Sequence, residues 1–299
     1  MQDLLRGRKT RKSRPAAKTR GKPTIKASKR LQPVADDHNW LRIALDEVLE
    51  RDQPLWRRPA GNFRGSGSGD LCVWSLTFGA LGHNVPHDAK RQRIFDTGKA
   101  IELGVVGAAK RAKVFVEGSD QLEGVHGDRM IVSHVDMVAR RPETGKKYLI
   151  EIKSIKNTDY GAYGFDTLPK EHGPTAAGKS PLMKNYRRYV VQWNTYAWSP
   201  EVDLEEGCLL FEAKNNQDRK FFWLVRDRGL LDETLARHEA AAEYAFGDPP
   251  RLAPVPEGFD PVAGEGECRR CDHRYLCKRL PAGPVEYDAV RAEDAKLRG

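Results

Sequence analysis

The chain has 299 residues, of which 39% are hydrophobic, enough to bury the core of one large domain or two small ones. No stretch approaches the roughly 18 consecutive apolar residues that a membrane helix needs, and the N-terminus lacks the apolar segment of a secretory signal. These features predict a globular cytoplasmic protein with no membrane partner.

The net charge of +9 is concentrated at the N-terminus. Residues 1–30 contain twelve Lys or Arg and one acid, Asp3, so they contribute +11, and the other 269 residues sum to −2. A folded part with this balance must bind any nucleic acid through a local basic patch. Residues 1–35 have few apolar side chains to bury and are predicted to be a disordered basic arm, which either attracts phosphates or acts as a solubilising extension. Residues 36–299 are predicted to be a single domain.

The first half of this domain combines helix and strand patterns. A predicted helix over 36–52 is followed by a loop over 61–70, where the sequence GNFRGSGSGD is rich in Gly and Ser. A second helix is predicted over about 88–112. Two strands, 129–140 and 146–155, are rich in aliphatic and β-branched residues and are predicted to form a hairpin around the turn RPETG.

The second half begins with a segment of low periodicity. Residues 156–182 are rich in Gly and Pro and are predicted to be a long loop. A helix follows over 183–198, and the stretches CLLFEAK and KFFWLV predict a second hairpin around the turn NNQD. A further helix is predicted over 230–246.

The first hairpin carries two acids and a lysine in a suggestive arrangement. A turn centred between Glu143 and Thr144 would place Asp136 opposite Glu151. Two facing carboxylates destabilise a sheet unless something neutralises them, and a divalent cation with oxygen ligands does so. Alternation along the strand places Lys153 on the same face as Glu151. The hairpin therefore has the outline of a reaction site.

Phosphodiester hydrolysis is the chemistry that needs these groups. Mg²⁺ or Mn²⁺ on the carboxylates would polarise a phosphoryl oxygen and activate water, and a lysine would orient that water or stabilise the developing charge. The alternative is a surface hairpin with solvated charges. Apolar neighbours in VDMV and LIEIKSI weigh against that alternative, because solvated charges seldom lie within such apolar strands.

Two further patterns give the hairpin a family resemblance. Upstream, Gly98 and Glu102 form a Gly-x-x-x-acid pattern, and downstream, Gln192 and Tyr196 in VVQWNTYAW share one helix face. In this order and spacing the chain resembles the RecB-like branch of the PD-(D/E)XK nucleases. The resemblance implies a restriction-endonuclease-like α/β fold, with a mixed central sheet flanked by helices.

The resemblance also implies roles for these residues. Glu102 would be an additional metal ligand, beside the two acids of the hairpin and the backbone carbonyl of Ile152. Gln192 would position the catalytic lysine or the DNA, and Tyr196 would pack or bond beside the site. Two departures are visible: Val135 replaces the proline of the family name, and Glu102 stands where many members carry histidine.

The cysteines are unevenly placed, which in a cytosolic protein suggests metal ligands. Cys268, Cys271 and Cys277 form a C-x2-C-x5-C pattern, and Cys72 can supply a fourth ligand. This set resembles that of iron-sulfur nucleases of the same branch, the CRISPR-associated exonuclease family and its phage relatives, over roughly residues 70–280. The resemblance implies a [4Fe-4S] cluster, with residues 264–280 closing onto Cys72. Thiolate chemistry leaves Zn²⁺ open as the alternative, with His273 as a nitrogen donor.

Other residues are candidates for DNA contact. Tyr160 and Tyr163, in the long loop, would stack on bases or anchor the loop to the core. Lys184, Arg187 and Arg188 would hold phosphates or be ordinary solvated charges. Cys208, within a predicted strand, is expected to be a small buried hydrophobe.

The resemblance implies an exonuclease that acts on DNA with single-stranded ends, in a bacterium or as a phage protein in the host cytoplasm. A DNA endonuclease or nickase with the same site is one alternative. A DNA-binding subunit that works with recombination or CRISPR-adaptation proteins is another.

Overall fold

The computed structural model describes residues 40–52, 61–70, 72–83, 85, 88–127, 130–157, 164–253, 268, 271–281 and 283–298. The predicted basic arm and the loop tyrosines, Tyr160 and Tyr163, lie outside these residues. The chain divides into two units, 1–43 and 44–299. Helix α1 (Trp40–Asp52) begins in the first unit and continues into the second, in agreement with the predicted helix over its described part.

The second unit contains both helices and strands. Its α-helices are α2 (Val73–Ala80), α3 (Ala89–Arg111), α4 (Met183–Ala197), α5 (Arg228–Ala245), α6 (Arg274–Cys277) and α7 (Tyr287–Arg298). Its 3-10 helices are η3 (Gly65–Gly67), η4 (Phe165–Thr167) and η5 (Ala177–Lys179). Its strands are β1 (Phe63–Arg64), β2 (Glu123–His126), β3 (Ile131–His134), β4 (Met137–Arg140), β5 (Lys147–Ile155), β6 (His172–Ala176), β7 (Glu206–Ala213), β8 (Arg219–Val225), β9 (Arg251–Leu252) and β10 (Val285–Glu286).

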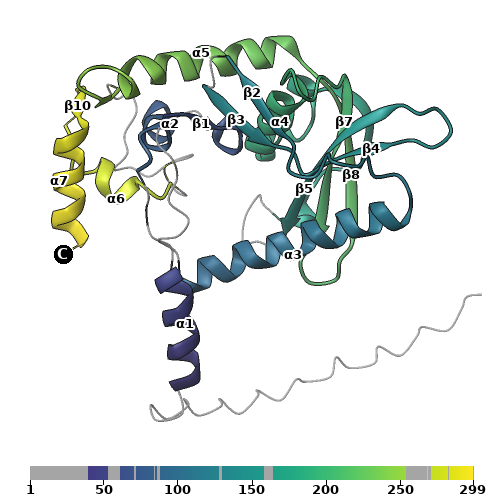
Figure 1. Ribbon diagram of the computed structural model, residues 1–299, viewed down its shortest axis with the longest axis horizontal. Coiled ribbons are helices and arrows are strands. Elements are labelled where there is room, and N and C mark those ends of the chain that lie inside the picture. The colour runs from purple at the N-terminus through teal and green to yellow at the C-terminus, as the bar shows by residue number, and fades with distance from the viewer. Residues whose placement is uncertain are drawn as a thin grey trace, which may run out of the picture. The chain divides into compact units, whose positions relative to one another are not determined.

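The central sheet has the strand order β4-β5-β7-β8-β6 and is mixed. Pairs β4–β5 and β7–β8 are antiparallel, whereas β5–β7 and β6–β8 are parallel. Helix α3 packs on one face, where Val105 shares a core with Ile150, and α4 packs on the other, where Trp193 shares a core with Leu149. Figure 1 shows α3 running along the sheet. The predicted α/β fold with a mixed sheet flanked by helices is confirmed.

The first hairpin has the predicted register, but its first strand is shorter than predicted. Met137 pairs with Ile150 and Val138 with Leu149, as the predicted turn requires. The prediction of one continuous strand over 129–140 is wrong, because the chain leaves β3 at His134 and enters β4 at Met137. Between them, the backbone of Val135 bonds to residues 121 and 122 instead of β5. Strand β3 therefore joins a second sheet, β1-β3-β2, and Asp136 lies at the junction.

Two predicted loops contain strands. Residues 61–70 form β1, which pairs in parallel with β3, and the 3-10 helix η3, which packs against α4. In 156–182, strand β6 pairs with the edge of the sheet at β8. Its sequence HGPTA has no apolar alternation, and its proline is tolerated because edge strands can leave a backbone position unpaired. Pairing of this kind depends on a neighbouring strand and has little local signal.

Two smaller cores lie beyond the central sheet. Phe63 and Ile131 of the β1-β3-β2 sheet pack with Leu76 of α2 and Ala241 of α5. The other core joins α2 to β9, α6, β10 and α7. Helix α5 extends from the region of α4 toward β10 and α7 (Figure 1). No helix in the described part of the chain is both long and apolar enough to cross a membrane.

Candidate active site

The two acids of the first hairpin lie beside each other. Glu151, in the middle of β5, is 1% exposed. Asp136 lies at the junction before β4, where its Oδ2 accepts a hydrogen bond from the backbone N–H of Ile152 at 2.6 Å. Burial, and then the charge of Glu151, raises the pKa of Asp136 well above its ordinary value. The structure therefore brings together the carboxylates that the turn register predicted.

The two oxygens of Glu151 have different surroundings. Oε1 accepts hydrogen bonds from Lys153 Nζ at 2.5 Å and from Gln192 Nε2 at 2.7 Å. Gln192 Nε2 also donates to the hydroxyl of Tyr196 at 2.8 Å. Oε2 is buried and has no hydrogen-bond partner among the described residues. An unpartnered buried carboxylate oxygen is costly, so this atom is suited to a cation.

Lys153 is held as a cation. Burial alone would lower the pKa of its ammonium group, but the charges of Glu151 and Asp136 outweigh burial and raise the pKa above its ordinary value. Its Nζ also lies 5.2 Å from the centre of the Tyr189 ring, within the range of a cation–π contact. As predicted from strand alternation, Lys153 and Glu151 share the face of β5 that α4 covers.

Glu102 lies close enough for its charge to act on both Asp136 and Glu151. Burial raises the pKa of Glu151, and the charge of Glu102 raises it further, as it does for Asp136. Lys153 opposes these shifts without cancelling them. The Oε1 atom of Glu102 accepts hydrogen bonds from Lys99 Nζ at 2.6 Å and from Gln121 Nε2 at 3.0 Å. The site has an excess of negative charge, which a divalent cation would offset.

Gly98 allows helix α3 to approach the central strand β5. A Cβ atom at this position would lie 3.2 Å from Ser154 Oγ in β5, closer than most side-chain contacts. Glu102 lies one helical turn further along α3. Gln121 was not predicted as part of the site, because it precedes β2 in a turn and no motif includes it; only the fold brings it to Glu102.

The cysteines lie close enough for their charges to act on one another, and the segments 254–267 and 269–270 that border Cys268 are outside the described residues. Burial, with smaller contributions from the charges of Cys271 and Cys268, raises the pKa of Cys72 to about 12. Burial also raises the pKa of Cys277, with contributions from Cys271, Cys72 and Cys268. Within the described ranges, neither these cysteines nor the acids Asp136, Glu151 and Glu102 form a group of three or more His, Cys, Asp or Glu side chains arranged to hold a metal ion.

Two neighbours bear on the chemistry of the cysteine group. His273 stacks on Phe78, with ring centres 4.3 Å apart, and its Nε2 lies 3.4 Å from the carbonyl oxygen of His83. These contacts engage the ring face and Nε2 of His273. Cys208 lies apart, buried in the core beneath α3, which confirms the prediction for that residue.

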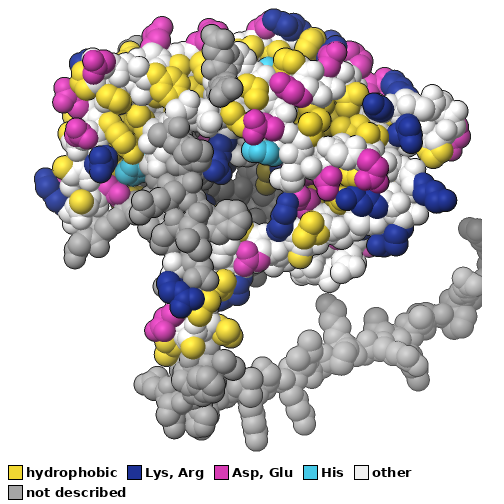
Figure 2. Space-filling model, in the orientation of Figure 1, with side chains coloured by type: hydrophobic (Ala, Val, Ile, Leu, Met, Phe, Trp, Pro, Cys, Tyr) yellow, Lys and Arg dark blue, Asp and Glu magenta, His cyan; other side chains and the backbone are white. Residues whose placement is uncertain are grey.

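The predicted DNA contacts on α4 differ in their surroundings. Lys184 is exposed. Arg187 bonds to the carbonyl oxygen of Gly69 and to Glu233, and Arg188 Nε lies 2.8 Å from Asp70 Oδ1. The two arginines are thus engaged within the chain. Figure 2 shows Lys and Arg side chains interspersed with Asp and Glu over one face, where they form no single basic stripe.

Comparisons with known proteins add little. No family model matches the chain, and no curated protein matches it. A solved structure described as "Crystal structure of SSO0001" is similar over 81% of this chain and 96% of its own, with 12% identity and a TM-score of 0.46. The fold described above therefore rests on the chain's own strands and helices.

Proposed function

We propose that the chain is a metal-dependent DNA nuclease of the RecB-like branch of the PD-(D/E)XK class. The observation that carries the proposal is the state of Glu151: one oxygen is held by Lys153 and Gln192, and the other is buried without a hydrogen-bond partner among the described residues. Asp136 and Glu102 add negative charge at the same place. Carboxylate oxygens with this excess charge suit Mg²⁺ or Mn²⁺.

Asp136, Glu151 and Glu102, with the backbone carbonyl of Ile152, would hold the ion. The bound ion would supply Lewis-acid polarisation of a phosphoryl oxygen. Lys153, whose side chain is 18% exposed, presents an ammonium group that can orient the attacking water or stabilise charge on the phosphate as the P–O bond breaks. Gln192 fixes one oxygen of Glu151, which leaves the other directed to the ion.

We favour exonucleolytic cleavage of DNA with single-stranded ends, on the strength of the motif resemblance. The same site would serve an endonuclease or nickase, because phosphodiester chemistry does not depend on how the strand enters. The arrangement of charged groups supports hydrolysis more directly than it supports either mode of cleavage.

We also propose that Cys72, Cys268, Cys271 and Cys277 bind a [4Fe-4S] cluster. Burial raises the pKa values of Cys72, Cys271 and Cys277, with smaller contributions from the neighbouring cysteines, and ligation of a cationic centre would stabilise their thiolates. Zn²⁺ is the alternative occupant. Either would close a loop of about 200 residues between Cys72 and the C-terminal cysteines, which stabilises the fold.

A cleavage assay tests the proposed function. End-labelled linear single-stranded DNA, linear duplex and circular DNA would be incubated with Mg²⁺, Mn²⁺ or EDTA. We expect metal-dependent shortening of linear DNA, whereas cleaved circles would favour the endonuclease. Binding without cleavage under every metal condition would contradict the proposal and favour a DNA-binding subunit.

Two variants identify the site in the same assay. Glu151→Gln and Lys153→Met should abolish cleavage and leave DNA binding largely unchanged. The matched control is Glu212→Gln, because Glu212 is also buried and paired with one base, Arg219, at 2.7 Å, but lies on the other face of the sheet from Glu151. Full activity in either site variant would remove the central claim.

A further inference from the structure

Residues 65–70, which lie between β1 and Cys72, are packed tightly onto helix α4. A Cβ atom on Gly65 would lie 2.4 Å from Cε1 of Tyr196 and 2.2 Å from Ser133 Oγ. A Cβ atom on Gly69 would lie 2.3 Å from the Cα of Arg188. These positions accept only glycine without movement of the surroundings, so the composition of this segment reflects close packing.

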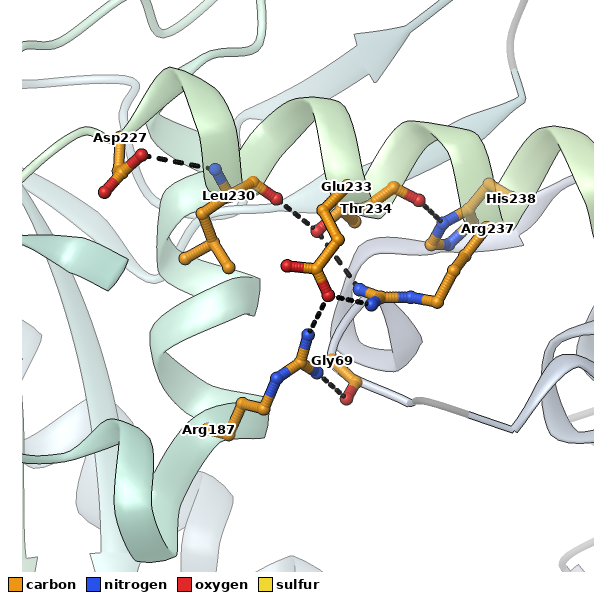
Figure 3. Close-up of polar contacts among 8 residues, drawn as sticks. All are labelled: Gly69, Arg187, Asp227, Leu230, Glu233, Thr234, Arg237 and His238. Carbon is orange, nitrogen blue, oxygen red and sulfur yellow. Dashed lines mark hydrogen bonds and ion pairs between the residues drawn. The ribbon is translucent and has the colours of Figure 1, made fainter. Parts of the chain in front are cut away.

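Arg187 fastens the segment to two helices. Its Nη1 donates to the carbonyl oxygen of Gly69 at 3.0 Å, and its Nη2 donates to Glu233 Oε1 on α5 at 3.0 Å. The same Glu233 oxygen accepts from Arg237 Nη1 at 2.6 Å. Figure 3 shows the Arg187 guanidinium reaching both Gly69 and Glu233. The Arg187 side chain is only 20% exposed, which restricts its access to a phosphate.

A second contact fastens the end of the segment. Asp70 Oδ1 lies 2.8 Å from Arg188 Nε, and Asp70 Oδ2 accepts from Ser75 Oγ at 3.0 Å. Ser75 belongs to the first turn of α2, and Cys72 is the N-cap of that helix. The contacts that hold residues 65–70 on α4, here called the clamp, therefore extend to α2, the helix whose N-cap is Cys72.

The other end of the segment touches the catalytic hydrogen bonds. Gly65 packs on the ring of Tyr196, whose hydroxyl accepts from Gln192, which in turn donates to Glu151. A movement of residues 65–70 would disturb the Tyr196 ring first. The cysteine group and the site thus lie at opposite ends of one short, tightly held segment.

We propose that Arg187 is a positioning residue that holds residues 65–70 on α4 and so couples the cysteine group to the Tyr196–Gln192–Glu151 hydrogen bonds. The activity readout rests on the proposed nuclease function. The clamp itself is a property of the fold, so it can be measured without cleavage. If Arg187 instead bound a phosphate, its substitution would weaken oligonucleotide binding and leave the hydrogen exchange of residues 65–70 unchanged.

The test compares Arg187→Lys and Arg187→Ala with the control Arg219→Ala, which breaks another arginine–carboxylate pair. Lysine cannot reproduce the two-nitrogen fork that reaches Gly69 and Glu233, but it can bind a phosphate. We expect both Arg187 variants to lower kcat on the order of tenfold, since small misplacements at a site have such costs. The Kd for a single-stranded oligonucleotide, measured in the Glu151→Gln background, should change by less than about twofold.

Hydrogen exchange provides the second readout. In both Arg187 variants, amides of residues 65–70 and 72–80 should exchange about tenfold faster or more, and the control should match the wild type there. Restored kcat in Arg187→Lys, a loss confined to Kd, or unchanged exchange would each overturn the inference. A wild-type protein that cleaves no DNA would overturn the proposed function instead, and exchange would still decide whether the clamp exists.

Discussion

The side-chain amide of Gln192 donates a 2.7 Å hydrogen bond to Glu151 Oε1, linking helix α4 to the central strand β5 inside the protein. The same nitrogen donates to the Tyr196 hydroxyl, one helical turn further along. Gln192 is 6% exposed. Together with Lys153, Gln192 thereby holds Glu151 in one orientation, with its second oxygen left for another partner.

Replacing Gln192 should weaken catalysis more than folding. Gln192→Met keeps the volume but removes both hydrogen bonds, so Glu151 loses its fixed orientation. We expect kcat to fall between about tenfold and a hundredfold, the range seen when groups that orient metal ligands are removed. Tyr196→Phe, which removes only the hydroxyl, should have a smaller effect. Equal activity in Gln192→Met and the wild type in a cleavage assay would contradict the positioning role.

Lys153 should stabilise the metal-free protein by pairing with Glu151. In Lys153→Met, Glu151 is left buried without its cation, and we expect unfolding free energy to fall by about 3 kcal/mol at neutral pH. The double variant Lys153→Met/Glu151→Gln removes the unpaired charge and should recover much of this loss. Urea unfolding in EDTA measures both. Additive losses in the double variant would show that the pair is not coupled.

The buried His238 should make stability fall in mild acid. Burial lowers its pKa from 6.5 to about 4, and its Nε2 has no hydrogen-bond partner within the described part of the chain. Because the folded pKa is lower than the unfolded one, its contribution is complete above pH 6.5 and is lost as the pH falls toward 4. The loss should reach about 3.5 kcal/mol at most, taking about 1.4 kcal/mol per unit.

Unfolding measured from pH 7 to 4 tests this expectation. His238→Leu should flatten the acid side of the stability curve, because no buried imidazole remains to be protonated. His134→Leu is the control, since that side chain is 52% exposed. If His238→Leu keeps the acid slope of the wild-type stability curve, the slope arises from other groups.

The glycines of residues 65–70 should differ sharply in their tolerance of alanine. Gly65→Ala and Gly69→Ala introduce a Cβ within 2.4 Å of existing atoms, and at Gly69 the obstacle is backbone, which cannot move aside. We expect losses of about 1–3 kcal/mol, the usual cost of overpacking. At Gly67 the nearest atom is 3.9 Å away. Gly67→Ala should therefore stay within about 0.5 kcal/mol of the wild type in thermal or urea unfolding.

The cysteine group can be tested by colour and metal content. Cys268→Ser should remove visible absorbance and bound iron and lower the melting temperature, because a cluster missing a ligand is less stable. Cys208→Ser alters a buried thiol in a different core and should retain both. Zinc in place of iron in the purified protein would support the alternative occupant. Unchanged metal content and stability in Cys268→Ser would contradict ligation by this residue.

Local rules predicted much of the candidate site. Strand alternation placed Lys153 with Glu151, and turn length set the register that pairs Met137 with Ile150. Helical spacing put Gln192 and Tyr196 on one face, where they now share a hydrogen bond. Each of these relationships joins residues close in the chain, so backbone geometry is sufficient to define it.

Longer-range relationships could not be predicted in the same way. Gln121 reaches Glu102 because its backbone N–H bonds to the carbonyl oxygen of Val135, next to Asp136, in the folded chain. In the sequence, Arg187 is indistinguishable from a solvated helix charge. In the structure it bonds to Gly69 and Glu233. No periodicity links these residues, and their partners come from segments far apart in the chain.

The sequence by itself determined the acids, the lysine and the α/β class, because charge, alternation and turn chemistry act over a few residues. The tertiary structure alone decided that the predicted 129–140 strand divides between two sheets and that residues 61–70 pack as part of the core. The physical reason is that backbone pairing at sheet edges and close packing at glycines depend on which surfaces meet, and those surfaces exist only once the whole domain has folded.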